Sequence, residues 1–176
     1  MSIDHNEQPG AMWRRAWVDG VDQFEGRWPE PYRISQNHDT GLIGQGTADW
    51  ENYRVSADVS ILLAKQGGIA ARVGGMRRWY ALLLCDDGFV RLVKDREAIS
   101  VLAEHPLAIK LDRPYRLSLT VVGNQITGEI DGRQFAEVVD DHDPLEPGGV
   151  ALIVTEGTLS SGAVRVEALP CWIEGS

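Results

Sequence analysis

The chain has 176 residues, of which 43% are hydrophobic, and its 26 acidic and 17 basic residues give a formal net charge of -9. This length supports one hydrophobic core and excludes two ordinary domains. The acidic balance repels phosphate backbones, which excludes nucleic acid as an expected partner. Because the sequence shows neither the apolar segment of a signal peptide nor a run of about 18 apolar residues, we expect a cytoplasmic protein with no membrane partner.

Glycine and proline, with 19 and 8 residues, punctuate the sequence at short intervals, as in a β protein with many turns. We expect residues 1–12 to form a flexible leader and residues 13–176 to form a single β-sandwich domain. Pro29 and Pro31 are incompatible with a helix, so residues 16–37 are predicted to form a short edge strand and a crossing loop.

The clearest strand pattern lies at residues 53–61. Tyr53, Val55 and the next three odd-numbered residues are apolar and alternate with polar residues, so one strand face is predicted to enter a core. Trp50 comes just before this strand, where it either stacks on a sugar ring or anchors the sheet. The inward parity of Tyr53 favours the anchor. The sequence KQGG at residues 65–68 then predicts a turn.

Several more strands follow. The apolar run WYALLLC, residues 79–85, predicts a strand that is covered on both faces, and a hairpin turn follows at Asp87 and Gly88. Residues 115–139 predict a meander of three strands with tight turns, and two further strands are separated by a turn at residues 156–162. About ten short strands with no helix predict an all-β, two-sheet antiparallel jelly-roll sandwich.

The order of these motifs resembles the concanavalin A-like, laminin G-like jelly-roll domains. The resemblance rests on GTADWENYRVSADV, GGIAARV and the hairpin ITGEIDG, and it covers residues 42–167. Within this group the chain is most similar to the accessory sandwich of bacterial ADP-ribosylglycohydrolase-type proteins. The resemblance implies a bacterial protein with a sugar or sugar-like ligand. It carries no enzymatic activity over to this chain, because function belongs to sites and not to folds.

Arginine and aromatic side chains concentrate on neighbouring predicted strands. If Arg72, Trp79, Tyr80 and Arg91 share one concave face, they combine planar hydrogen-bond donors with stacking surfaces, as sugar-binding sites do. We therefore predict these four as the ligand-binding residues. The alternative is that Tyr80 lies in the core and that the arginines pair with surface acids such as Asp58.

The sequence GEIDG, residues 128–132, resembles the active-site strand of laminarinase-type glucanases, in which two carboxylates flank the glycosidic bond. Glu129 and Asp131 match the first two positions, but Arg133 and Gln134 stand where the general acid is expected. A hairpin turn also explains Asp131. We therefore predict no catalytic residue.

No metal or cofactor site is predicted. The four histidines are scattered without ligand spacing, and Cys85 and Cys171 lie far apart, which is typical of free thiols. Asp140, Asp141 and Asp143 offer oxygen ligands of the kind that Ca²⁺ takes, but Asp before Pro144 is also ordinary turn chemistry. Calcium is kept as the alternative.

The sequence thus predicts a non-catalytic module that binds carbohydrate or another sugar-containing small molecule. Two alternatives stay open. One is a hydrolase acting on glycosidic or ADP-ribosyl bonds, and the other is a structural module that assembles with a larger enzyme or as a homo-oligomer. Trp13, Trp17, Trp28 and Trp172 bear on the last alternative, because large aromatics outside the strands either seal a sandwich or form a protein interface.

Overall fold

The computed structural model describes residues 18–20, 23–25 and 32–170, and this part of the chain contains twelve strands and no helix. Accordingly, none of its elements is a helix that could cross a membrane. The strands are β1 (Val18–Gly20), β2 (Gln23–Glu25), β3 (Tyr32–Gln45), β4 (Tyr53–Gly75), β5 (Arg78–Cys85), β6 (Phe89–Arg96), β7 (Ile99–Pro106), β8 (Tyr115–Val122), β9 (Gln125–Ile130), β10 (Arg133–Val139), β11 (Gly149–Ser161) and β12 (Arg165–Ala168). The predicted leader, Cys171 and the four tryptophans Trp13, Trp17, Trp28 and Trp172 lie outside the described residues.

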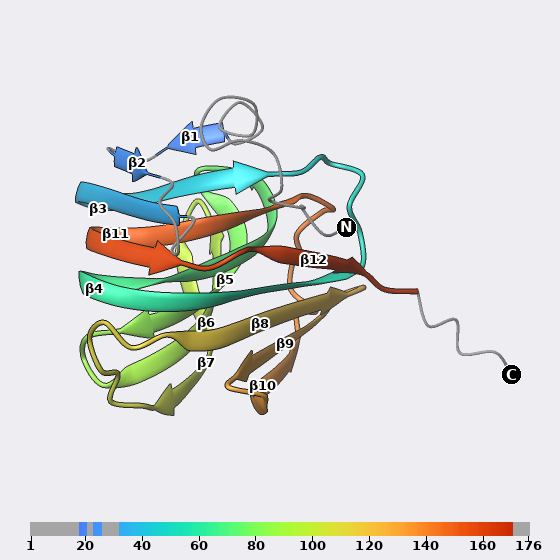
Figure 1. Cartoon of the computed structure of the whole chain (residues 1–176). Coiled ribbons are helices and arrows are strands. Elements are labelled where there is room, and N and C mark those ends of the chain that lie inside the picture. The colour runs from blue at the N-terminus through green and yellow to red at the C-terminus, as the bar shows by residue number, and fades with distance from the viewer. Residues whose placement is uncertain (1–17, 21–22, 26–31, 171–176) are drawn as a thin grey trace, which may run out of the picture.

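The strands form two antiparallel layers that share the long strands β3, β11 and β4 (Figure 1). In the first sheet, the first half of β4 pairs with β8 on one side and with β12 on the other, and β9 and β10 continue beyond β8. In the second sheet, the second half of β4 pairs with β5, followed by β6 and β7. The predicted two-sheet antiparallel jelly-roll sandwich is confirmed.

The sequence KQGG does not form the predicted turn, because β4 runs through it without a break. The strand bends instead at Leu62. Thr158 of β11 pairs with Leu63 and Leu159 pairs with Ile61, so Leu62 has no partner on β11 and forms a β-bulge. Gly68 is required for close packing, since a Cβ there would collide with the carbonyl oxygen of Leu82. The predicted turn at residues 156–162 is likewise a bend inside β11, at Glu156 and Gly157.

The predicted crossing loop is also shorter than expected, because β3 begins at Tyr32. A strand fits here because Tyr32 and Ile34 alternate with the exposed Arg33 and are fully buried. The prolines that exclude a helix lie before this point.

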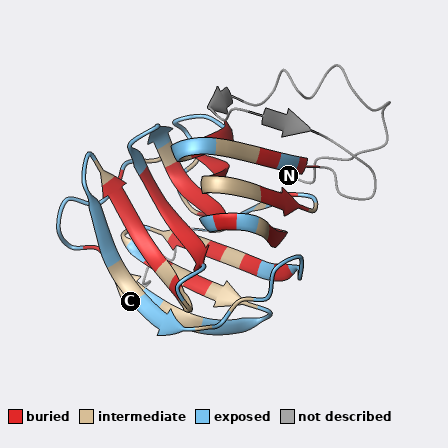
Figure 2. Ribbon diagram, turned by 90° about the vertical axis from the view of Figure 1, so that its left-hand side faces the viewer, coloured by how far each residue is buried: buried red, intermediate tan, exposed pale blue. Residues whose placement is uncertain are grey.

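The main core lies between the two sheets, and buried residues follow the central strands (Figure 2). The odd-numbered residues Tyr53–Ile61 of β4 and Tyr115–Val121 of β8 point into it, and none of them is more than 3% exposed. The predicted alternation is therefore confirmed on both strands. It leaves the even-numbered, polar residues on the outer face of the first sheet.

The second sheet is covered on both faces, as the WYALLLC run predicted. Tyr80, Leu82 and Leu84 face the main core, and the residues that alternate with them join a second apolar cluster on the outer face of the sheet. That cluster contains Leu42, Ala70, Trp79, Ala81, Leu83, Cys85, Val93, Ala151 and Ile153. Burial raises the pKa of the Cys85 thiol to about 11, so this cysteine stays protonated.

Candidate functional site

Tyr53 ties the start of β4 to the loop before β11. Its hydroxyl lies 2.9 Å from the carbonyl oxygens of both Gly148 and Gly149, and it accepts the backbone N–H of Arg72 at 2.7 Å. Trp50 packs against Tyr53 edge to face, with ring centroids 6.1 Å apart. Burial raises the pKa of Tyr53 to about 12. This stretch fixes a corner of the sandwich, in agreement with the anchor interpretation of Trp50.

Arg72, the first of the four predicted ligand residues, is 6% exposed. Its Nε and Nη2 donate to the carbonyl oxygen of Glu51 at 3.2 and 2.9 Å, and its Nη1 donates to the carbonyl oxygen of Leu145 at 2.9 Å. The guanidinium therefore connects the loop that contains Glu51 to the loop that contains Leu145. It supplies hydrogen-bond donors to backbone carbonyl oxygens in both loops.

Tyr80 belongs to a buried polar network. Its hydroxyl donates to the Asp140 carboxylate at 2.6 Å and accepts the Leu145 N–H at 2.9 Å. Lys94 donates to the same carboxylate at 2.6 Å and to two carbonyl oxygens of the loop that follows. Burial by itself raises the pKa of Asp140, but the hydrogen bonds from Lys94 and Tyr80 outweigh it and hold the pKa below its ordinary value.

Trp79 and Arg91 lie on the other face of the second sheet. Trp79 is 1% exposed in the second apolar cluster, and its indole N–H donates to the carbonyl oxygen of Met76. Arg91 bonds to the carboxylates of Asp87 and Glu104, each at 2.6 Å, and these contacts raise its pKa further above the ordinary value. Both side chains already have structural partners.

The expectation that the four predicted residues share one concave face is wrong. Arg72 and Tyr80 are directed to the loop that contains Leu145, whereas Trp79 and Arg91 occupy the opposite side of the sheet. The physical reason is the alternation of β5, which sends neighbouring residues to opposite faces. Ligand contact by any of the four stays a prediction, and their burial and pairing favour structural roles.

A groove of about 580 Å³ lies instead on the outer face of the first sheet. Its central row is formed by Arg165, Ser56, Ser118 and Glu129, which stand in register on the adjacent strands β12, β4, β8 and β9. Residues in register on neighbouring strands project from the same face, so the four side chains form one continuous polar row. We call this surface the polar groove; its lining includes Arg54, Ser56, Arg116, Ser118, Glu129, Arg165 and Glu167.

A second row, parallel to the first, contains Glu167, Arg54 and Thr120 in register. The Nε of Arg54 donates to the Thr120 hydroxyl at 3.1 Å, and its Nη2 lies 3.7 Å from the Glu129 carboxylate. The Arg54 guanidinium is therefore held between the two rows. The carboxylate of Glu167 and the hydroxyls of Ser56 and Ser118 make no hydrogen bond or ion pair with any residue that the structure describes.

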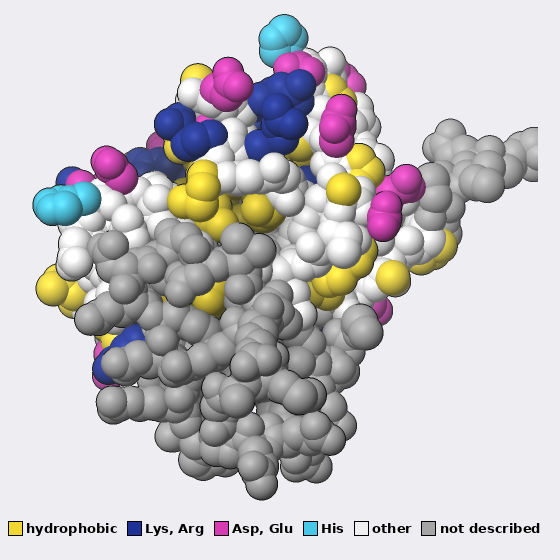
Figure 3. All heavy atoms as spheres, turned by 90° about the horizontal axis from the view of Figure 1, so that it is seen from above, with side chains coloured by type: hydrophobic (Ala, Val, Ile, Leu, Met, Phe, Trp, Pro, Cys, Tyr) yellow, Lys and Arg dark blue, Asp and Glu magenta, His cyan; other side chains and the backbone are white. Residues whose placement is uncertain are grey.

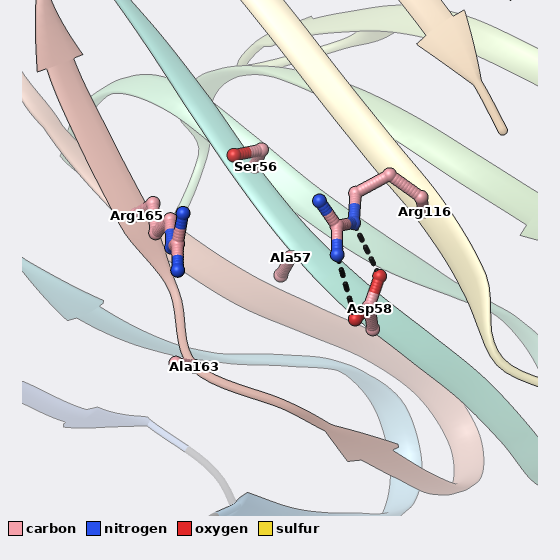
Figure 4. Close-up of a pocket in the computed structure, with 6 residues that line it drawn as sticks. All are labelled: Ser56, Ala57, Asp58, Arg116, Ala163 and Arg165. Atoms are coloured by element: carbon pink, nitrogen blue, oxygen red, sulfur yellow. Dashed lines mark hydrogen bonds and ion pairs between the residues drawn. The ribbon is translucent and has the colours of Figure 1, made fainter. Parts of the chain in front are cut away.

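A small pocket of about 100 Å³ adjoins the polar groove at Ser56 (Figure 4). The guanidinium groups of Arg165, on β12, and Arg116, on β8, stand on either side of this serine. The Nε and Nη2 of Arg116 bind the two carboxylate oxygens of Asp58 at 2.5 and 3.0 Å, which raises the pKa of Arg116. The guanidinium of Arg165 makes no ion pair or hydrogen bond with the described residues.

Charge is mixed on one face of the protein. On the face shown in Figure 3, basic and acidic side chains lie next to one another, with no block of a single sign among the described residues. The polar groove follows the same pattern, because its three arginines are balanced by Glu129, Glu167 and the adjoining Asp58. Such a surface suits a ligand with many hydroxyl groups, since it offers donors and acceptors side by side.

The GEIDG segment has the turn geometry that the sequence predicted. Asp131 and Gly132 have φ of 50° and 79°, as a two-residue primed turn between β9 and β10 requires. The Asp131 carboxylate accepts the backbone N–H of Arg116 at 2.9 Å. Only Glu129 of this segment therefore presents a carboxylate to the polar groove.

Asp140, Asp141 and Asp143, which the sequence offers as an alternative calcium site, point to different partners. Asp140 pairs with Lys94, Asp141 with Asn124, and Asp143 with Arg96. No group of three or more His, Cys, Asp or Glu side chains in the described ranges is placed to hold a metal ion. The carboxylates act as anchors for the loop between β10 and β11.

The groove residues were present in the sequence as the polar half of the alternating strands. Arg54, Ser56, Arg116 and Ser118 are even-numbered polar residues of these strands, and the alternation alone predicts only that they face away from the core. The signal that distinguishes them from other solvated positions is their alignment with Arg165 and Glu129, and this alignment depends on pairing between strands that are far apart in the sequence.

Comparison with solved structures supports the fold. The carbohydrate-binding module CBM66 from Bacillus subtilis is 19% identical, with a TM-score of 0.75 over 86% of this chain and 95% of that chain. A Bacillus subtilis protein with a galectin-like fold is 16% identical, with a TM-score of 0.64 over 88% and 90% of the two chains. The Caenorhabditis elegans galectin LEC-6 is 14% identical, with a TM-score of 0.55 over 90% and 99%.

Sequence comparison gives the family. No curated protein matches the chain. The family model described as the galactocerebrosidase C-terminal lectin domain matches residues 27–164, most of the sandwich. This match confirms the lectin-like part of the resemblance noted in the sequence. The chain belongs to the family of galactocerebrosidase C-terminal lectin domains.

Proposed function

We propose that this lectin-like domain binds carbohydrate in the polar groove and does not catalyse a reaction there. The observation that carries the proposal is the row of Arg165, Ser56, Ser118 and Glu129, which stands in register across four strands and opens to solvent. The groove volume of about 580 Å³ is that of a site for a small ligand. The family match and the likeness to a carbohydrate-binding module and a galectin support the same function.

The chemistry of the polar groove fits sugar hydroxyls. A carboxylate such as Glu129 accepts hydrogen bonds from two hydroxyl groups, and a planar guanidinium such as Arg54 donates to the ring and hydroxyl oxygens. The serines do both. No aromatic residue lines the groove in the described part of the chain, so recognition is by hydrogen bonds and not by ring stacking.

The polar groove is also prepared for binding. Arg54 is held by Thr120 and Glu129, and Arg116 is held by Asp58 through two bonds. Side chains that are fixed before the ligand arrives lose less conformational entropy on binding. The arrangement therefore favours a ligand site over an ordinary solvated sheet face.

The absence of a catalytic step is part of the proposal. Hydrolysis of a glycosidic bond requires one carboxyl group that donates a proton and a second that attacks or activates water. Glu129 and Asp58 are each ion-paired with an arginine, so neither carboxylate is left without a partner to take one of these two roles. The resemblance to ADP-ribosylglycohydrolase-type accessory domains adds ADP-ribose as a narrower candidate ligand.

Calorimetric titration tests the proposal. The folded chain is titrated with neutral oligosaccharides, acidic oligosaccharides and ADP-ribose, and Glu129→Gln is expected to weaken binding of the best ligand about tenfold because it removes an ionised acceptor. Glu146→Gln, an exposed loop residue, is the matched control and should bind normally. Chromatography of the titrated sugar should show no cleavage. Absence of binding to every sugar, or an unchanged affinity in Glu129→Gln, would overturn the proposal.

A further inference from the structure

The small pocket beside Ser56 differs in charge from the rest of the polar groove. Two guanidinium groups and one carboxylate line it, which leaves one net positive charge. The carboxylate of Asp58 is already bound by Arg116 through Nε and Nη2. The guanidinium of Arg165 makes no ion pair with any described residue, in a chain whose overall charge is -9.

The donors in this pocket converge. Arg165 and Arg116 stand on either side of Ser56, and the Nη1 of Arg116 makes no bond to the described residues. The serine hydroxyl between them is also unbonded there. A guanidinium binds planar oxyanions through two parallel N–H bonds, and the volume of about 100 Å³ suits a small group of this kind.

The pocket is continuous with the polar groove, because Ser56, Arg116 and Arg165 line both. We infer that the domain selects acidic sugars, with an oxyanion substituent of the sugar bound between Arg165 and Arg116 while its hydroxyl groups occupy the row that leads to Glu129. This inference rests on the proposed function. It deepens that function by giving the class of ligand.

The test compares oligosaccharides that differ in one group. Glucose and glucuronic acid disaccharides, a galactose and galacturonic acid pair, and a sulfated galactoside are titrated into the full chain by calorimetry. We expect the acidic member of at least one pair to bind about tenfold more tightly than its neutral partner, which corresponds to one charge-assisted contact. The sulfated sugar distinguishes a carboxylate from a sulfate as the preferred oxyanion.

Arg165→Gln locates the selectivity. The Arg165 side chain is exposed and makes no hydrogen bond or ion pair with the described residues, so this variant is expected to fold normally. It should remove the tenfold preference by weakening the acidic sugar much more than its neutral partner, whereas Arg165→Lys should keep part of the preference. Arg78→Gln, an exposed arginine on β5 of the second sheet, is the matched control and should behave like the native chain.

The outcomes separate the two claims. Equal affinity for neutral and acidic sugars would overturn this inference and leave carbohydrate binding intact. An acidic preference that persists in Arg165→Gln would overturn the assignment to this pocket. Binding to no sugar of either class would remove the proposed function and the inference together.

Discussion

The outer faces of the two sheets are each formed by every second residue of their strands, but the two faces have opposite properties. The outer face of the second sheet holds Trp79, Leu83 and Ile153, each about 1% exposed, in a second apolar cluster. The outer face of the first sheet holds the open polar groove around Ser56 and Ser118. Arg72, Trp79, Tyr80 and Arg91 draw attention in the sequence, but each is already bonded to other parts of the sandwich. The ligand site that we propose lies among less conspicuous polar residues.

Trp79→Ala gives the sharpest test of this comparison. Removing a fully buried indole is expected to lower the free energy of unfolding by about 4 kcal/mol, because it loses apolar burial and leaves a cavity. Urea denaturation followed by circular dichroism measures the change, and Trp79→Phe should cost much less. Sugar affinity of the folded variant should be unchanged. Lost binding with unchanged stability would instead restore Trp79 as a ligand residue.

Asp140→Ala is expected to lower the free energy of unfolding by about 3 kcal/mol. It leaves the ammonium group of Lys94 buried without its carboxylate and removes the acceptor of the Tyr80 hydroxyl. The same denaturation experiment measures this, with Asp141→Ala on the exposed loop as the control. A cost below about 1 kcal/mol would show that the network is not important for stability.

The pH dependence of stability tests the contribution of the Asp140 carboxylate. Its pKa in the folded chain is below the ordinary value of 3.8, so its contribution is complete above that value and is lost as the pH falls through the folded pKa. The stability difference between the native chain and Asp140→Asn should therefore be constant near neutral pH and shrink below pH 3.8. A difference that stays constant down to about pH 2 would contradict the assignment.

Asp58→Asn should have the smallest effect on stability. Its ion pair with Arg116 is exposed, with side-chain exposures of 45% and 57%, so water and salt screen it. We expect a loss of about 0.5 kcal/mol in the same assay. A loss comparable to that of Asp140→Ala would mean that the outer face of the first sheet is as important for stability as the interior, which would weaken the contrast between the two faces.

Some features of the fold could be predicted from local patterns. Tyr53–Ile61 and Tyr115–Val121 alternate strictly, the Asp131 turn has its glycine, and the WYALLLC run identifies a strand covered on both faces. The bends at Leu62 and Glu156 could not be predicted in this way. Glycine in KQGG signals either a turn or close backbone approach, and only the neighbouring strand decides which.

The sequence by itself determined that the chain is a β-sandwich, which residues face its core, and that Trp50 and Tyr53 anchor a corner. These properties depend on short-range periodicity and turn chemistry, which a single segment carries. Only the tertiary structure decided that Arg72 and Tyr80 are buried cross-links and that Arg165 stands in register with Ser56. More than a hundred residues separate Arg165 from Ser56 in the sequence, and no local pattern encodes which strands become neighbours.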